Sequence, residues 1–164
     1  PKKQRQILAN ICRSLSVGGY LVSQISSAGE KNCALRSDLS NLESLGRTPD
    51  GQVFHWTTVE EYMGLLRKAG FVGNAFVGSA PPNAYGPEDQ WVRFNSKAGR
   101  EAEGNGDHEA VASIAGRKEA FLLESYGLLA LYSAQCPLEE LGVEYRRDGS
   151  ALIHYQYPII VSEK

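Results

Sequence analysis

Residues that could take part in catalysis are few and scattered in this 164-residue chain. The three histidines and three cysteines show no paired spacing of the kind that holds a metal ion, so the sequence predicts no metal site. No histidine accompanies a nucleophile motif such as G-x-S-x-G, so no serine-hydrolase triad can be argued. His55, just before Trp56 and a predicted helix, is the candidate general base if the substrate must lose a proton. The alternative for His55 is a structural or exposed histidine.

Polar and aromatic residues near predicted strand ends are the candidate substrate contacts. Ser26 and Ser27 begin a long connection, residues 26–54, which leaves a predicted strand at its carboxyl end. In open α/β sheets the ligand crevice lies at that end of the strands, and loops longer than about fifteen residues are often functional. We therefore expect Ser26 and Ser27 to contact the substrate, together with the aromatic side chains of Trp56 and Tyr85. Tyr85 stands among prolines, where the alternative is a surface turn.

The elements that must position these residues alternate between helix and strand. Apolar residues at helical spacing predict a first helix: Ile7, Leu8, Ile11 and Leu15. Gly18 and Gly19 then break the chain before an apolar strand over residues 20–25. A second helix over residues 57–70 begins at a capping threonine and ends at a glycine, and a strand over 71–78 follows. This order indicates an α/β layer with at least partly parallel strands. Within the long connection, four leucines have the spacing of a short helix: Leu35, Leu39, Leu42 and Leu45.

The second half of the chain predicts a short strand, a linker, a long helix and a hairpin. Residues 91–94 have the composition of a strand, and the glycine-rich, charged residues 96–107 predict a mobile linker or loop. The helix predicted over 109–134 is apolar nearly all round in its second half, so we expect it to be buried on more than one side or to meet a partner. Asp148 and Gly149 stand between two apolar runs and predict a two-residue hairpin turn.

The first ninety-five residues together resemble the C-terminal half of a class I S-adenosylmethionine-dependent methyltransferase. That family often shows a leucine, two residues, two glycines and an apolar strand, then a helix start with Thr and Glu and an ending in Ala-Gly-Phe. The matching positions here are Leu15, Gly18, Gly19, Leu21 and Val22, then Thr57, Thr58, Glu60, Glu61 and Ala69-Gly70-Phe71. The resemblance implies the C-terminal part of a Rossmann-like methyltransferase sheet, with an added long helix and a C-terminal β-hairpin.

Methyltransferase sheets of this family usually finish with an antiparallel hairpin, and residues 158–164 look like such an ending. Pro158 would interrupt a central ladder, so either its strand lies at an edge or a new strand begins at Ile159. If 158–164 is the last strand, the long helix is an insertion before it. If residues 91–94 are the last strand, the helix and hairpin are an appended module. We favour the insertion.

The set of residues that binds the cofactor in this family is missing from the chain. No early strand leads into a glycine-rich turn, and the only G-x-G, Gly104 to Gly106, follows a charged loop, where a flexible linker is the expected structure. The chain also begins at Pro1 and goes directly into a helix. We therefore expect S-adenosylmethionine to bind only with a missing N-terminal half, which is either a partner chain or part of a longer protein.

These predictions divide the chain into three parts. Residues 1–95 are the C-terminal half of a methyltransferase-like α/β domain, residues 96–107 are a linker or loop, and residues 108–164 are a helix plus β-hairpin that completes the sheet as an insertion or appended module. The resemblance implies methyl transfer to a small-molecule or carrier-bound acceptor. Such a reaction needs the two reactants held close and water excluded more than it needs a fixed catalytic motif.

Composition favours a folded domain without naming its chemistry. Hydrophobic residues make up 42% of the chain, and a net charge of -2 gives no reason to expect nucleic-acid binding. No apolar run approaches the roughly twenty residues of a membrane span. An odd number of cysteines without C-x-x-C spacing favours reduced thiols in the cytoplasm.

Two further functions stay open beside methyl transfer. A non-catalytic methyltransferase-like module could use its sheet edge and long helix to bind another protein. Another doubly wound enzyme, such as a nucleotide-dependent oxidoreductase, could show the same order of helix, glycine pair and strand.

Overall fold

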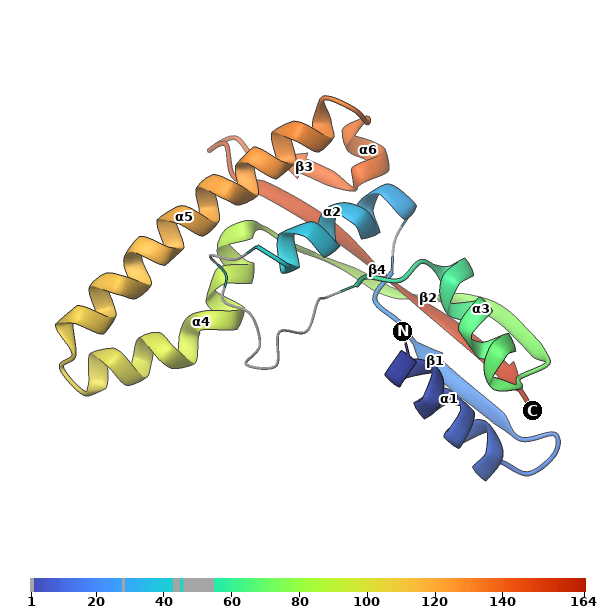
Figure 1. Ribbon diagram of the computed structural model, residues 1–164. Coiled ribbons are helices and arrows are strands. Elements are labelled where there is room, and N and C mark those ends of the chain that lie inside the picture. Colours follow the sequence, from blue (N-terminus) through green and yellow to red (C-terminus); the bar gives the residue numbers. More distant parts are fainter. Residues whose placement is uncertain (1, 28, 43–44, 46–54) are drawn as a thin grey trace. The chain divides into compact units, whose positions relative to one another are not determined.

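The computed structural model describes residues 2–27, 29–42, 45 and 55–164 (Figure 1). The described chain forms two compact units. Unit 1 contains Pro1–Ala28, Thr57–Asn83 and Tyr155–Lys164, and unit 2 contains Gly29–Trp56 and Ala84–His154. Both units mix helices with strands, so the expected combination of helices with a sheet is confirmed. Much of the predicted long connection, including residues 46–54, lies outside the described residues.

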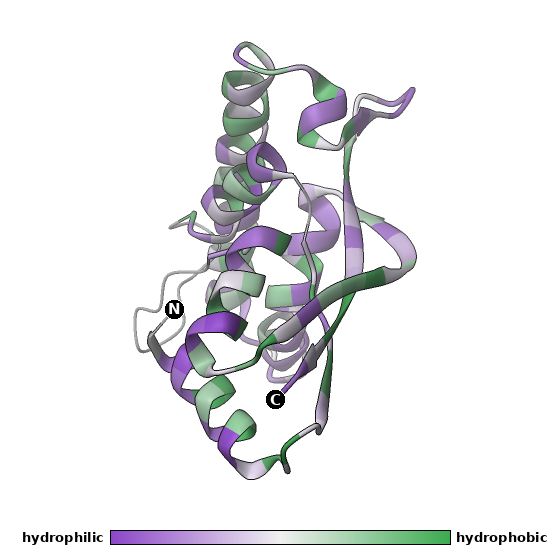
Figure 2. Cartoon of the chain, turned by 90° about the vertical axis from the view of Figure 1, so that its right-hand side faces the viewer, coloured by the Kyte–Doolittle hydropathy of each residue, from purple (hydrophilic) through white to green (hydrophobic). Residues whose placement is uncertain are grey.

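Unit 1 packs two amphipathic helices against one face of its strands. Helix α1 (Lys2–Ser14) and helix α3 (Val59–Ala69) lie side by side. In Figure 2 hydrophobic and hydrophilic residues alternate along the helices. Their apolar sides meet strand β1 (Tyr20–Gln24) and the end of strand β4 (Ala151–Glu163). The core cluster consists of Leu8, Cys12, Tyr62, Leu66, Phe71 and Ile160.

The strands follow the order β1-β4-β2, and β3 (Val143–Tyr145) also pairs with β4. The β1–β4 pair is antiparallel and joins Tyr20 to Glu163 and Gln24 to Ile159. Strand β2 (Gly73–Tyr85) is also antiparallel to β4, because Gly73 lies beside Glu163 while Gly86, just past the strand, lies against Ala151. The expectation of partly parallel pairing is therefore wrong for neighbouring strands. The last strand lies between two strands that run the other way.

Pro158 lies inside this central strand and does not end it. The prediction that Pro158 would interrupt a central ladder is wrong. The hydrogen-bond ladder between β4 and β1 tolerates the loss of one backbone N–H donor. Ile25 donates its backbone N–H to the Pro158 carbonyl at 3.1 Å, and the return bond is absent because proline has no N–H. Regular β1 ends at Gln24 for this reason, and a bridge between Ser27 and Gln156 continues the same register.

Two glycines in unit 1 occupy backbone conformations that other residues adopt only with strain. Gly18 has a φ of +77° in the turn from α1 to β1, and its N–H donates to the Lys164 carbonyl at 3.2 Å. Gly70 ends α3 with a φ of +107°. Both glycines belong to the predicted breaks, and their conformations explain why these two elements end where they do.

Unit 2 is mostly helical. It contains helix α2 (Glu30–Ser40), helix α4 (Pro87–Gly104), helix α5 (His108–Ser133) and helix α6 (Leu138–Leu141), with α4 and α5 side by side (Figure 1). Trp91 of α4 and Phe121 of α5 pack with ring centroids 5.6 Å apart, next to the buried Leu45. The long helix and a hairpin at Asp148 and Gly149 are thus confirmed. The predicted two-residue turn is wrong, because Tyr145 pairs with Ala151 and Arg146 donates its N–H to the Ser150 carbonyl at 2.8 Å, which makes the loop longer.

Residues 91–94 and 96–107 were expected as a strand and a linker, and both expectations are wrong. Residues 87–104 form one continuous helix, in which Gly86 is the N-cap and Pro87 occupies the first turn. Proline is well suited to that position because its missing N–H has no partner inside the helix. The Asp89 carboxylate accepts the Gly86 N–H at 2.9 Å, which completes the cap. The last strand is therefore β4, and helices α4 to α6 are inserted between β2 and the final hairpin.

Thr58 is expected to contribute measurably to stability because it closes a capping box on α3. Its hydroxyl accepts the Glu61 N–H at 3.2 Å, and the Glu61 carboxylate accepts the Thr58 N–H at 2.9 Å. Thr58→Ala should lower the free energy of unfolding by about 1 kcal/mol in urea titrations. The control is Thr57→Ala, one residue before the cap, which should stay within about 0.5 kcal/mol of wild type. Equal losses in both variants would contradict this role.

Candidate functional site

Unit 2 contains an open polar hollow of about 530 Å³ beside the hairpin turn. Its walls come from the start of α4, from the middle of α5 and from the segment between β3 and β4. The lining residues are Gly86, Glu88, Asp89, Tyr126, Arg146, Asp148, Gly149, Ser150 and Ala151. The hollow lies at the carboxyl end of β2, because Gly86 directly follows Tyr85, the last residue of that strand.

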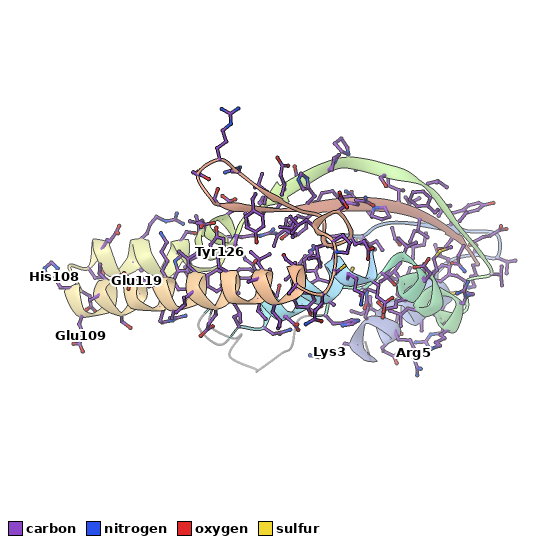
Figure 3. The ribbon with its side chains drawn as sticks, turned by 90° about the horizontal axis from the view of Figure 1, so that it is seen from above. Lys3, Arg5, His108, Glu109, Glu119 and Tyr126 are labelled. Atoms are coloured by element: carbon purple, nitrogen blue, oxygen red, sulfur yellow. The ribbon has the colours of Figure 1, made fainter. Side chains whose placement is uncertain are left out.

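Tyr126 links the three walls of this hollow. Its hydroxyl donates to Oε1 of Glu88 at 2.9 Å and accepts the backbone N–H of Ala151 at 3.2 Å. Figure 3 labels Tyr126 on α5. Burial and the neighbouring Glu88 carboxylate raise the pKa of the Tyr126 hydroxyl. Tyr126 therefore stays protonated at neutral pH and orients the Glu88 carboxylate.

The other acidic groups of the hollow already have backbone partners. Asp89 accepts from Gly86, and Asp148 accepts from the N–H of Ser150 at 3.0 Å and its hydroxyl at 2.7 Å. The hydrogen bonds from Ser150 lower the pKa of Asp148. The hollow presents carboxylates and the Arg146 guanidinium and suits a polar ligand.

A second, more apolar hollow of about 520 Å³ lies in unit 1, beside β1 and α1. Among the described strands, β1 pairs only with β4, so its other edge presents backbone groups that no described strand uses. Leu21 and Ser23 face the helices, where Ser23 accepts a hydrogen bond from the Tyr62 hydroxyl at 3.0 Å. Tyr20 and Val22 alternate with them and are 61% and 66% exposed.

Apolar residues of β4 continue this exposed sheet face. In an antiparallel pair, residues directly opposite each other lie on the same face, and Val22 is paired with Val161. Ile159 stands two residues earlier in β4 and therefore shares the face with Val161. Ile159 and Val161 are half-buried. Unit 1 thus combines an open strand edge with an incompletely covered apolar face.

Residues of α2 hold Trp56 in place within unit 2. Its indole N–H donates to the Ser40 hydroxyl at 3.0 Å, and its backbone N–H donates to the Ser37 hydroxyl at 3.0 Å. The guanidinium carbon of the buried Arg36 lies 3.5 Å from the centre of the indole ring. These contacts hold Trp56 on α2. His55, the candidate base, precedes it in an irregular segment and is exposed.

The remaining predicted contacts fall in different units. Ser26 is half-buried and Ser27 is fully buried in unit 1, where the backbone of Ser27 exchanges hydrogen bonds with Gln156 at 3.0 and 3.2 Å. This burial argues against a substrate contact through the Ser27 side chain. Tyr85 is half-buried in unit 2 and ends β2, so the alternative of a surface turn at Tyr85 is wrong, because the residue belongs to a strand. The structure does not bring the predicted residues together within one unit.

Sequence reasoning missed the residues of the polar hollow. A local signal was present, because Gly-Pro-Glu-Asp from Gly86 to Asp89 is a helix start with proline in the first turn and an acidic residue three positions after the cap. The turn at Asp148 was predicted, but the contact between Tyr126 and Ala151 depends on packing across twenty-five residues.

Comparison with known proteins does not place this chain in a family. The chain matches no protein-family model and no curated protein. Among the described residues, no group of three or more acidic, histidine or cysteine side chains is arranged to hold a metal ion. No helix in the described part of the chain combines the length and hydropathy that a membrane span requires. All three cysteines are described, and none forms a disulfide.

Removing the Tyr126 hydroxyl is expected to destabilise the protein. Tyr126→Phe leaves the N–H of Ala151, a residue only 1% exposed, without its partner, so the free energy of unfolding should fall by about 1–3 kcal/mol at pH 7. The folded state raises the pKa of Tyr126, so this contribution is complete below about pH 10 and is lost as the pH rises through the raised value. Urea unfolding from pH 7 to 11 measures both effects, with the exposed Tyr145→Phe as control. Equal losses in both variants would contradict the assignment.

Proposed function

We propose that this chain is the acceptor side of a class I S-adenosylmethionine-dependent methyltransferase, which transfers a methyl group to a small-molecule or carrier-bound acceptor. The observation that carries the proposal is the place of β4 in the sheet. The resemblance implies a sheet that finishes with an antiparallel hairpin, and the last strand here lies antiparallel between β1 and β2. The matched positions lie in or before the two strands that flank β4, because Leu21 and Val22 belong to β1 and Ala69-Gly70-Phe71 precedes β2. The cytoplasm, where reduced thiols persist, is the proposed location.

The open edge of β1 supports the second part of the proposal, a separate cofactor-binding half. A strand edge with exposed Val22 and Tyr20 is a liability in water, and natural sheets pair or cover such edges. The apolar hollow beside it is lined by Ile7, Leu8 and Ile11 of α1. We infer that the cofactor half adds its own strand along this edge and covers the exposed face of β1.

The residues of this chain do not fit the cofactor by themselves. A cofactor turn follows an apolar strand and leads into a helix. The only G-x-G instead ends helix α4, where Asn105 is the C-cap and Gly106 has a φ of +67°. No reaction step is therefore assigned through the cofactor, and this chain's part is to hold the acceptor and exclude water. His55 is exposed, and it stays the candidate general base if the acceptor must lose a proton.

Titration of S-adenosylmethionine tests the proposal directly. Calorimetry with this chain alone should give no binding, and the chain together with the segment encoded immediately upstream should bind the cofactor with one site. The same complex should then methylate an acceptor. If neither form binds S-adenosylmethionine, the methyltransferase assignment fails. In that case the alternative is a non-catalytic methyltransferase-like interaction module, which is favoured by the same open edge and would still bind a partner there.

Val22→Lys should weaken association with the upstream segment because it places a charge at the proposed strand interface. The residue is 66% exposed, so the fold of this chain should be unchanged by circular dichroism. Co-purification and the apparent affinity for S-adenosylmethionine should both fall by at least about tenfold, as expected for a charge left in an apolar contact. Val92→Lys, at a residue of α4 that is 56% exposed, is the matched control. Unchanged association with Val22→Lys would exclude this edge as the interface.

A further inference from the structure

The open edge of β1 presents backbone groups that point away from β4. At one end of the pairing, the backbone groups of Ser27 and Gln156 exchange hydrogen bonds of 3.0 and 3.2 Å. The direction of these groups alternates along a strand, so every second residue before Ser27 directs its N–H and C=O toward β4. The residues between them direct theirs toward the open edge, and in β1 these are Tyr20, Val22 and Gln24. Among the described strands none pairs with this edge.

The apolar hollow of unit 1 lies directly beside this edge. It is lined by Gln4, Ile7, Leu8 and Ile11 of α1, by Leu21, Val22, Ser23 and Gln24 of β1 and by Tyr62 of α3, and none of these residues is charged. Ile7 is 58% exposed although it belongs to this apolar wall. Side chains alternate between the two faces of a sheet, so every second side chain of a strand added to β1 would enter the hollow.

Positive charge lies beside the hollow on the α1 side. Residues 1–28 contain four basic residues, Lys2, Lys3, Arg5 and Arg13, and no acidic residue. The other two segments of unit 1 each contain equal numbers of basic and acidic residues, so unit 1 has a net charge of +4 in a chain whose net charge is -2. Lys3 is exposed and precedes Ile7 by four residues, so the two lie on the same side of α1. An acidic group is the charge that fits beside this hollow.

We propose that the partner at this edge is an extended, acidic segment that adds to β1 as a strand. Its backbone bonds to Tyr20, Val22 and Gln24. Its alternate side chains are apolar and fill the hollow beside Ile7, and one of its carboxylates pairs with Lys3. The segment is taken to belong to the cofactor-binding half, and only this assignment rests on the proposed function.

The backbone groups of the edge favour a peptide over other anionic partners. The edge presents N–H donors and C=O acceptors in alternation, and another peptide backbone matches both. The phosphates of a nucleic acid offer acceptors only, so they would leave the edge carbonyls of β1 without donors. The apolar wall around Ile7 also has no role in binding a phosphate.

A synthetic peptide tests the chemistry of the partner without S-adenosylmethionine. The fluorescent peptide has about seven residues, in which isoleucine and valine alternate with threonine and a glutamate stands at each end, so that it can pair in either direction. Fluorescence anisotropy with the full chain should show saturable binding. Binding should be lost when all peptide amides are N-methylated, because the strand then has no donors. A peptide with lysine in place of both glutamates should bind about fivefold more weakly.

Variants of α1 test the two contacts at the hollow. Lys3→Glu should weaken binding of the glutamate peptide by about fivefold because it reverses a charge pair, and Ile7→Asn by about tenfold because it removes apolar contact. Arg5→Glu is the matched control, since it changes the net charge equally but lies about 200° further around the helix. At about 0.15 M salt it should change the affinity less than about twofold. All three residues are exposed, so circular dichroism should be unchanged, and Figure 3 labels Lys3 and Arg5.

Amide hydrogen exchange tests the strand addition. Saturating peptide should slow exchange at the N–H groups of Val22 and Gln24 by at least about tenfold, whereas the N–H of Ser23, which already faces β4, should change less. Binding without this protection would overturn the proposal. Equal weakening by Lys3→Glu and Arg5→Glu would also overturn it, as would tighter binding to the lysine peptide or to phosphatidylserine vesicles than to the glutamate peptide.

The peptide experiment and the cofactor titration can fail separately. Binding of the glutamate peptide by a chain that never binds S-adenosylmethionine, even with the upstream segment, would support the acidic strand and overturn only the methyltransferase assignment. Cofactor binding by the joined halves without binding of the glutamate peptide would overturn the acidic strand and leave the methyltransferase assignment in place.

Discussion

The pairing of β4 with its neighbouring strands is the constraint on which the rest of the structure depends. One end of β4 carries Ile160 into the core of unit 1, and the other end pairs with β3 in unit 2. Its residues alternate between core and surface over most of the strand. Both outer strands run opposite to it, so the position of this last segment decides the order of the whole sheet. Even the missing donor of Pro158 is tolerated because the bonds around it hold the register.

In unit 1 helices cover one face of the strands, while the edge of β1 and the other face are exposed. This asymmetry is the physical basis of the functional proposal. Helices α1 and α3 bury one face of the strands around Leu66 and Phe71. The free edge of β1 and the exposed side chain of Val22 have no such cover among the described residues. A Rossmann-like sheet is covered on both faces, so the proposed additional half would satisfy both the sequence resemblance and the exposed surface.

Unit 2 supplies the polar hollow. Tyr126 joins Glu88 of α4 to the backbone of Ala151, so the polar hollow is held by one side chain. Helix α5 therefore contributes both to the core, through Phe121, and to the hollow, through Tyr126.

Local features of the sequence determined most of the secondary structure. The glycines that end elements, a threonine cap at Thr57 or Thr58, a hairpin at Asp148 and Gly149 and the long helix were predicted, because each depends on contacts within a few residues. The start of α4 carries a local signal too, but the strand-like composition of residues 91–94 led to the wrong prediction. In the structure that segment is helical, and Trp91 packs against Phe121, which lies thirty positions later in the chain.

Only the tertiary structure decided how the strands are ordered and which side chains are exposed. The pairing of Tyr20 with Glu163 joins residues near opposite ends of the chain, and no local pattern specifies such a pair. Because local patterns do not specify long-range contacts, the sequence predicted Ser27 and Trp56 as substrate contacts. In the structure Ser27 is buried, and Trp56 is held on α2. The sequence by itself determined where α3 and α5 begin and end, to within two residues, since capping and periodicity act locally. The sheet order, the polar hollow and the open edge of β1 were decided by contacts between distant segments.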